Sequence, residues 1–375
     1  MKKNLGLNRG EELRAYWLLV LPALLIYLLV MAFPTILSVL LSVSNFNGGK
    51  MIGEGSNWKI TGLEQYFILL KDPYFWQALK NNAYIVLISV FGQIPLGFLF
   101  AYLIFRKLVK WPAFWQGILY VPAIISTIVL GILWQTIFSP YGPIADIMNG
   151  IYTTSFHDKL EALVRNSGGL NITDDLVNNI IKLAGPESMS QFDNPFADLK
   201  EFCLTYTPDQ LNEFLDDMTN ILAKQWSTDF LSKPDVSMIP ILFVTLWQWT
   251  GLYLIIFLAN MQRIDVQIIE AAQIDGASEG QVLWNIILPS LSGVIVTAAI
   301  LAISGSLKSF DLIFAMTGGG PAKITQVLSI YMYDNAFRTT PNYPLANSIS
   351  TVMILISLFL IFITRKIENI FGGKE

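Results

Sequence analysis

Residues 238–260 read MIPILFVTLWQWTGLYLIIFLAN, a run that contains no Asp, Glu, Lys, Arg or His. As an α-helix this run would be about 35 Å long, enough to cross the roughly 30 Å hydrocarbon core of a bilayer. Five other long stretches also lack charge: residues 15–43, 83–105, 114–138, 286–307 and 346–364. A buried core helix does not explain six such stretches. The sequence therefore predicts an all-α membrane protein with six transmembrane helices.

The composition agrees with a chain that is partly immersed in lipid, because only 14% of the 375 residues are charged against roughly 25% in a soluble domain. With one cysteine, Cys203, and one histidine, His157, the chain cannot form an internal disulfide or a histidine-rich metal site. We therefore expect no metal and no cofactor. The net charge of −4 gives no reason to expect a nucleic-acid partner.

The charges are distributed unevenly along the chain. Residues 140–237 hold fifteen acidic and six basic residues, a net charge of −9, whereas the rest of the chain carries +5. Within this acidic block, Thr207-Pro208-Asp209-Gln210 has the pattern of a helix N-terminus. Apolar residues recur at helical spacing in three places: Leu160, Leu163 and Val164; Leu176, Ile180, Ile181 and Leu183; Leu211, Phe214, Leu215, Met218 and Leu222. We expect a small helical insert outside the membrane.

Lys and Arg residues near the ends of the six stretches predict the orientation, because such residues favour the cytoplasmic side. They precede the first stretch, fill the loop between the second and third, and follow the sixth: Lys2, Lys3, Arg9, Arg14, Arg106, Lys107, Lys110, Arg365, Lys366 and Lys374. Both termini are therefore expected in the cytoplasm, together with the loop of residues 261–285. The acidic block then lies outside.

The six stretches carry neutral polar residues in place of titratable ones. Ion-coupled carriers and voltage sensors use charged residues inside the membrane, so this sequence argues against ion-driven transport. The neutral polar residues gather beside Trp247, Trp249 and Tyr253 in the fourth stretch and occur in three others: Gln93, Gln135, Gln248, Thr250, Gly251, Thr297, Ser304 and Ser306. They suit an uncharged, hydroxyl-rich solute, and packing between helices is the other interpretation of the same residues.

The loop of residues 263–289 has the pattern of two short helices joined by a turn. Ile268, Ile269, Ala271 and Ala272 give the first helix an apolar side. Gly276 can adopt the positive φ that ends a helix, and Ser278 can cap the second helix. A compact unit of this kind, projecting into the cytoplasm, suits a groove on a partner protein.

This loop resembles the EAA loop of ABC-importer permeases, whose pattern is EAA, three residues, G, nine residues and I-x-LP. Every position of that pattern is matched: Glu270-Ala271-Ala272, Gly276, Ile286 and Leu288-Pro289. The resemblance implies that the loop docks in a cleft of a partner ATPase and couples transport to ATP hydrolysis. It assigns coupling to Glu270, Ala271, Ala272, Asp275, Gly276 and Ala277.

The resemblance extends to the sugar-type permeases, which include the maltose, multiple-sugar and glycerol-phosphate importers, and covers about residues 16–150 and 237–365. The segment from Phe310-Asp311 to Gly320-Pro321 carries it, and Asn81-Asn82, Arg106 and Val121-Pro122 also fit. In this family the substrate passes the fourth and fifth spans, which implies a path along Gln248, Trp249, Thr250, Gly251, Ser304, Gly305 and Ser306.

What the resemblance implies is a type I ABC-importer permease fold in the prokaryotic cytoplasmic membrane. The implied partners are a second homologous permease, expected to form a heterodimer with this chain, two ABC ATPase subunits, and an extracytoplasmic solute-binding protein that delivers a sugar. The chain has no G-x-x-x-x-G-K-[ST] sequence to hold ATP phosphates. We therefore expect a transporter subunit rather than an enzyme, with no catalytic residue in this chain.

Five parts make up the expected organisation. They are a cytoplasmic tail at 1–14, helices one to three at 15–150, the insert at 151–235, helices four to six at 236–365 with the coupling loop at 261–289, and a second tail at 366–375. The insert departs from the resembling family, whose typical members have a short loop there. It is expected either to dock the solute-binding protein or to cap the external gate.

Two alternatives stay open on the sequence. An importer of the same assembly could carry a non-sugar solute such as a glycerophosphodiester, whose anionic group could meet Lys308. Lys308 is otherwise explained as an anchor at the membrane interface. The second alternative is a secondary transporter that needs no coupling ion.

Overall fold

The computed structural model describes residues 9–50, 58–140, 142–167, 170, 172–189, 192–223, 230–231, 233–234, 236–338 and 340–371. Parts of the two predicted tails, with Lys2, Lys3 and Lys374, lie outside the described residues. The described residues form helices, loops and an isolated bridge between Ser44 and Ile60. The chain divides into two compact units, residues 1–127, 242–314 and 318–375 in one, and residues 128–241 and 315–317 in the other.

The helices that are long and apolar enough to cross a membrane agree with the six predicted stretches. Four of them are Tyr16–Ser42, Pro73–Phe105, Met238–Met261 and Tyr343–Lys366. Two more are helix pairs broken by a bend, Pro112–Ile124 with Thr127–Ile137 and Glu279–Ser290 with Ser292–Leu307. When each pair counts as one span, the described residues contain six candidate spans, so the all-α fold with six apolar spans is confirmed.

Three of the spans contain a π-helical turn that ends two residues before a proline. The turns are η1 (Leu28–Ala32) between α1 (Arg9–Tyr27) and α2 (Phe33–Ser42), η2 (Ser89–Gln93) between α4 (Pro73–Ile88) and α5 (Ile94–Phe105), and η4 (Leu283–Ile287) between α14 (Glu279–Val282) and α15 (Leu288–Ser290). The prolines are Pro34, Pro95 and Pro289. A proline ring collides with the carbonyl four residues earlier and cannot donate to it. A locally wider turn accommodates both effects.

The second span begins at Pro73, ten residues before the expected start of the uncharged stretch 83–105. Asp72 caps α4 by accepting a hydrogen bond of 2.9 Å from the backbone N–H of Tyr74, and Pro73 occupies the first helical position, where no N–H is needed. Lys80 lies in this additional part of the helix, which it does not interrupt because lysine is a good helix former, and its ammonium group lies over the ring of Tyr84, 5.7 Å from the centroid. Absence of charge is therefore a poor marker of the helix end here.

Two glycines allow α12 (Met238–Met261) to pack closely on its neighbours in the first unit. A Cβ atom added at Gly97 of α5 would lie 2.6 Å from Cβ of Tyr253. One added at Gly251 of α12 would lie 2.0 Å from the backbone oxygen of Leu119 in α6 (Pro112–Ile124). Only glycine permits these approaches between backbones, so α12 lies directly against both α5 and α6.

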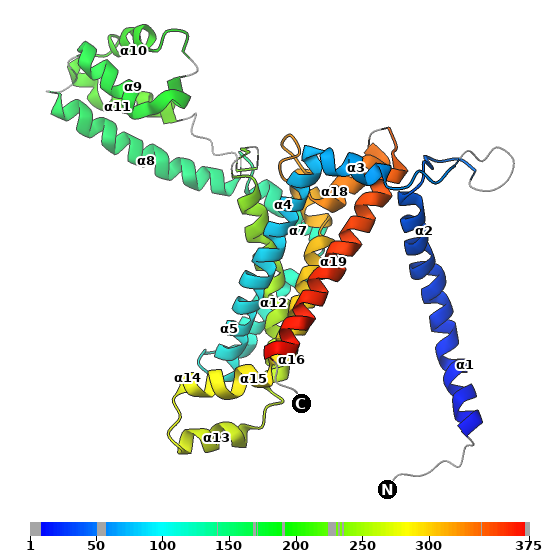
Figure 1. Cartoon of the computed structure of the whole chain (residues 1–375). Coiled ribbons are helices and arrows are strands. Elements are labelled where there is room, and N and C mark those ends of the chain that lie inside the picture. Colours follow the sequence, from blue (N-terminus) through cyan, green and yellow to red (C-terminus); the bar gives the residue numbers. More distant parts are fainter. Residues whose placement is uncertain are drawn as a thin grey trace. The chain divides into compact units, whose positions relative to one another are not determined.

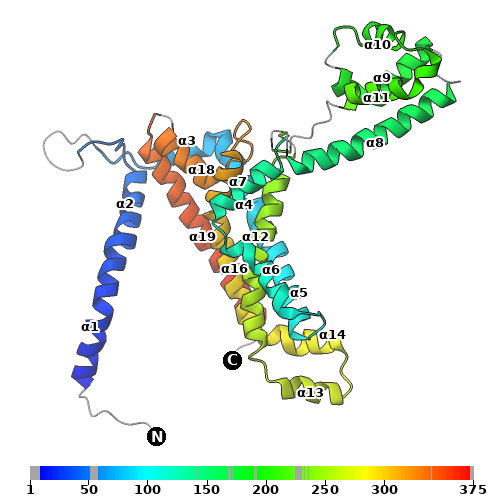
Figure 2. The same cartoon turned by 180° about the vertical axis from the view of Figure 1, so that it is seen from behind.

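Buried side chains join the remaining helices of the first unit at the end where α3 (Glu64–Lys71) and α18 (Leu328–Tyr333) lie. The amide of Asn82 donates to the carbonyl of Ser306 in α16 (Ser292–Leu307), at 3.0 Å, and accepts from the backbone N–H of Leu328, at 2.8 Å. The hydroxyl of Tyr331 donates to Asp72. Figures 1 and 2 show α13 (Val266–Ile274) and α14 at the opposite end of these helices.

The first span contributes little to the core, since none of the residues in its most apolar stretch is buried. Its contact with the rest of the unit runs through α2 and α19 (Tyr343–Phe371), which lie next to one another. Ser38 donates to the side-chain oxygen of Asn347 at 2.6 Å, and Ser348 donates to the carbonyl of Ser42 at 3.1 Å. The apolar side chains of α1 are therefore left exposed by this chain.

The second unit contains a helical region with a hydrophobic core of its own. Its helices are α8 (Pro143–Asn166), α9 (Asp174–Met189), α10 (Pro195–Cys203), η3 (Pro208–Gln210) and α11 (Leu211–Ala223). The predicted capping box forms between Thr207 and Gln210. Most of the predicted apolar residues enter the core, including Leu160, Val164, Leu176, Ile180, Phe214, Leu215, Met218 and Leu222. The helical character of the insert is therefore confirmed, and α8 begins before the expected boundary at residue 151.

The second unit also contains most of α7 (Thr127–Ile137), which precedes α8 in the chain.

Candidate functional site

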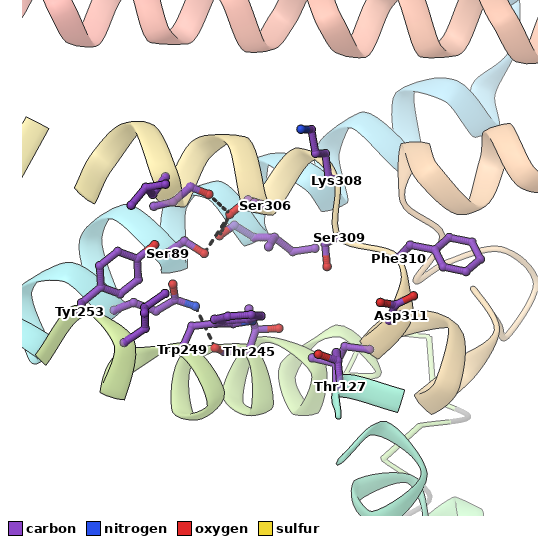
Figure 3. A pocket seen from close by; sticks show the side chains of 17 residues that line it. Ser89, Thr127, Thr245, Trp249, Tyr253, Ser306, Lys308, Ser309, Phe310 and Asp311 are labelled. Atoms are coloured by element: carbon purple, nitrogen blue, oxygen red, sulfur yellow. Dashed lines mark hydrogen bonds between the residues drawn. The ribbon is translucent and has the colours of Figure 1, made fainter. Parts of the chain in front are cut away.

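A cavity of about 280 Å³ lies among helices of the first unit. Segments that are far apart in the sequence supply its walls. They are Ile85, Ser89 and Gln93 of α4 and η2; Thr127; Thr245, Trp249, Leu252 and Tyr253 of α12; Leu301, Ala302, Gly305 and Ser306 of α16; and Lys308, Ser309, Phe310, Asp311 and Leu312. Figure 3 shows Ser89, Trp249 and Ser306 converging on it from three different helices.

Hydrogen bonds between neutral groups hold these walls together. The hydroxyl groups of Ser306 and Ser89 lie 2.9 Å apart, which joins α16 to η2. The amide of Gln93 donates to the carbonyl of Thr245 at 2.8 Å, which joins η2 to α12 (Figure 3). In a medium without water such bonds leave few alternative arrangements for the helices. The cavity is therefore lined by hydroxyl, amide and aromatic groups in defined positions.

The segment after α16 brings two charged residues to the cavity. Lys308 lines it, but in Figure 3 its ammonium group points away from Trp249 and Thr245. Asp311 is the first residue of α17 (Asp311–Thr317), where a carboxylate interacts favourably with the helix N-terminus. The cationic group is thus turned away from the aromatic and hydroxyl groups, which form the inner wall.

The residues expected along the substrate path fall into two groups. Trp249, Gly305 and Ser306 line the cavity. Four others lie outside its described lining: Gln248, Thr250, Gly251 and Ser304. Gln248 is fully buried and donates to the hydroxyl of Thr127 at 3.0 Å, so it reaches the cavity through that residue. Thr250 donates to the carbonyl of Leu246 within its own helix, at 2.6 Å, and Gly251 packs on α6.

Sequence reasoning did not single out four hydroxyl residues of the cavity: Ser89, Thr127, Thr245 and Ser309. Serine and threonine are too common in membrane helices for a single one to be informative. Spacing could have pointed to Ser89, because it precedes Gln93 by four residues and therefore lies on the same helix face. Even this signal does not say which other helix that face meets.

At the other end of these helices lies the loop of residues 261–289, which forms the predicted helix–turn–helix and is here named the coupling hairpin. Asp265 caps α13 by accepting from the backbone N–H of Gln267 at 2.9 Å. Gly276 has φ +86° and ends the helix. Ser278 and Gln281 then form a capping box at the start of α14. The expected turn at Gly276 and the expected cap at Ser278 are confirmed, whereas the cap at Asp265 was not predicted.

The hairpin has one face on the core and one in solution. Ile269 and Val282 are buried, and Ala272 and Ala277 pack partly against the same core. The other predicted coupling residues are exposed: Glu270, Ala271, Asp275 and Gly276. The predicted apolar side was partly wrong, because Ile268 is exposed while Ile269 is buried. Residues 269 and 272 share one face, and Val266, Ile268 and Ile274 lie exposed on α13.

Known proteins resemble this chain over nearly its whole length. A probable ABC transporter permease protein of Pyrococcus horikoshii is 26% identical over 355 residues, which cover 95% of this chain and 96% of that protein. The multiple sugar-binding transport system permease protein of Streptococcus mutans is 25% identical, with coverages of 96% and 98%. The lactose transport system permease protein of Rhizobium radiobacter is 25% identical, with coverages of 92% and 91%.

A solved structure supports the fold. One chain of a bacterial ABC transporter involved in the import of the acidic polysaccharide alginate has a TM-score of 0.64 and 17% sequence identity, covering 97% of this chain and 99% of that one. Residues 93–372, which include α12, α16 and the coupling hairpin, match the family described as "Binding-protein-dependent transport system inner membrane component". The chain therefore belongs to the binding-protein-dependent transport system inner membrane components and has the fold of an ABC-importer permease.

Proposed function

We propose that this chain is one of two permease subunits in an ATP-driven importer and carries a sugar or oligosaccharide by alternating access. The observation that carries the proposal is the placement of the two sites on the same helices. The cavity lies between α4, α12 and α16, and the coupling hairpin lies at one end of these helices. A displacement of the hairpin would thus be transmitted to the cavity walls.

The chemistry of the cavity supports a sugar as the solute. The hydroxyl groups of Ser89, Thr245 and Ser306 and the ring of Trp249 line it. Hydroxyl and amide groups exchange hydrogen bonds with sugar hydroxyls, and an aromatic face packs against the C–H groups of a sugar ring. The relatives named for lactose and for multiple sugars support the same class of solute.

The exposed face of the coupling hairpin supports docking of a partner ATPase. Glu270 is exposed on the same helix face as Val266 and Ile274, which lie four residues to either side and are 54% and 86% exposed. An apolar helix face with one carboxylate fits a groove on another protein. The proposed coupling set remains Glu270, Ala271, Ala272, Asp275, Gly276 and Ala277, of which Ala272 and Ala277 hold the hairpin to the core.

The remaining partners and the orientation follow from the same assembly. The exposed apolar length of α1 and α2 leaves surface for lipid or for a second, homologous permease. The C-terminal end of α5, the hairpin and the C-terminal end of α19 lie at one end of the unit, which is the cytoplasmic end in the proposed orientation. The acidic insert then lies outside, where it docks the solute-binding protein or covers the external gate.

Reconstitution tests the proposal. The chain is purified with its partner permease, its ATPases and its solute-binding protein and placed in proteoliposomes. Uptake and ATP hydrolysis are measured over a panel of neutral sugars and phosphoesters. Uptake of a sugar that depends on both ATP and the binding protein is expected. Stimulation by phosphoesters alone would favour the non-sugar alternative, and uptake without ATP would favour a secondary transporter.

A further inference from the structure

A polar cluster ties the coupling hairpin to the end of α5. Its centre is the carboxylate of Glu279, the first residue of α14. The guanidinium of Arg106, which caps the C-terminus of α5, forms a two-point ion pair with it, and the bond from Nε to Oε2 is 3.0 Å. Tyr102 donates to Oε2 at 3.3 Å, and Gln273 of α13 donates to Oε1 at 3.0 Å. One carboxylate thereby connects α5, α13 and α14.

The geometry makes this cluster an orientational restraint more than a source of stability. A planar guanidinium that meets both oxygens of a carboxylate fixes direction as well as distance. The Arg106 side chain is only 16% exposed, whereas that of Glu279 is 57% exposed, so the net stabilisation by the pair itself is modest. The hydrogen bond that Arg106 donates to Glu279 raises the pKa of Arg106, which stays charged at every physiological pH.

The span that ends at Arg106 lines the cavity with Ile85, Ser89 and Gln93. From Gln93 to Arg106 the chain is helical, so the two sites are about 20 Å apart along one helix. At the cavity end this helix is bonded to α16 through Ser89 and Ser306. At the hairpin end it is bonded to α14, which leads into α16 through η4 and α15. The two helices are therefore joined at both ends.

We infer that Arg106 and Glu279 are positioning residues that make α5 move together with the coupling hairpin. The inference rests on the proposed function, since it assumes that a partner displaces the hairpin. Without the pair, such a displacement reaches the cavity through α16 only, and α5 can lag behind. With the pair, the displacement reaches Ser89 and Gln93 on one wall and Ser306 on the other at the same time.

The test compares four variants in the reconstituted complex. Arg106→Gln and Glu279→Gln each remove one charge, and the double variant Arg106→Glu with Glu279→Arg reverses the pair. Lys107→Gln is the matched control, because Lys107 is the next residue and its side chain is exposed. The readouts are sugar transported per ATP hydrolysed, the ATPase that co-purifies with the permease, and hydrogen–deuterium exchange of residues 266–282.

Each single neutralisation is expected to lower the transport-to-hydrolysis ratio by about two- to tenfold and to speed exchange in the hairpin. The reversed pair is expected to restore at least half of the ratio, and the control to leave it unchanged. The amount of bound ATPase stays constant in all variants.

A ratio that stays at the wild-type level in Glu279→Gln would overturn the inference and leave the proposed function intact. A loss of bound ATPase would also overturn it, because the cluster would then serve docking rather than transmission. Failure of the wild-type complex to import any sugar with ATP would instead count against the proposed function.

Discussion

The coupling hairpin and the cavity are built in opposite ways. The hairpin is one contiguous segment whose turn and caps are made by neighbouring residues, such as Gly276 and Ser278. The cavity takes its walls from segments that include Ser89, Trp249 and Ser306 and that meet only after the helices have packed. A local change should therefore disable the hairpin without disturbing the fold, whereas the cavity depends on helix contacts at some distance from it.

The largest effect is expected where the cavity depends on packing. Gly251→Ala places a methyl group 2.0 Å from the backbone oxygen of Leu119, so α6 and α12 must separate at a cost of about 1–3 kcal/mol. The thermal midpoint of the purified permease measures this loss. Gly305→Ala is the control, because Gly305 lines the cavity and no atom lies within 4 Å of its added Cβ. Equal midpoints for the two variants would contradict the packing role of Gly251.

A local change in the hairpin is expected to affect coupling more than stability. Gly276→Val puts a β-branched residue at φ +86°, which costs roughly 1–2 kcal/mol within the hairpin. Sugar uptake driven by ATP should fall by about tenfold while membrane insertion stays normal. Gly280→Ala, in α14, has free space for its Cβ and serves as the control. Normal uptake by Gly276→Val would exclude the proposed coupling role.

Within the cavity a single side chain is expected to have a smaller effect. Trp249→Ala removes an aromatic face that lines the cavity, and the lost contact is worth about 1 kcal/mol. The sugar concentration for half-maximal ATPase stimulation should therefore rise about fivefold. Trp247→Ala changes a tryptophan of equal exposure, 37%, that lies two residues away on α12 and outside the cavity lining. If both variants respond alike, the cavity is not the sugar site.

The smallest effect is expected in the insert, which should respond neither to a substitution at the contact of α6 with α12 nor to one in the coupling hairpin. Cys203 is fully buried in its core, and burial raises the pKa of its thiol to about 11. At pH 8 little thiolate is present, so a maleimide reacts slowly. The rate should stay equally slow in Gly251→Ala and Gly276→Val and should rise when the insert is denatured. Fast labelling of the native wild-type protein would contradict a separate core.

Much of the fold could be predicted from the sequence, because a segment that crosses a bilayer must be apolar and about 20 residues long. A helix is the way for a single apolar segment to satisfy its backbone hydrogen bonds inside a bilayer. Uncharged length therefore located all six spans, although the helix at Pro73 begins earlier than the uncharged stretch at residue 83. The hairpin was predictable as well, since a glycine turn and a serine cap act over a few residues.

The candidate site was predicted only in part, because side chains from different helices make it. Trp249 and Ser306 could be anticipated on the fourth and fifth spans, whereas Ser89 and Ser309 could not. A polar residue in a membrane helix has two uses, packing and solute contact, and the residue type does not separate them. Gly251 serves packing, as its distance to Leu119 requires.

The sequence by itself determined the number of spans and the shape of the coupling hairpin. Each of these depends on interactions within a few residues or on the length of one apolar segment. Only the tertiary structure decided that Ser89 meets Ser306 and that Arg106 meets Glu279. Those pairs are more than 170 residues apart in the chain, and they form only where packed helices bring their faces together.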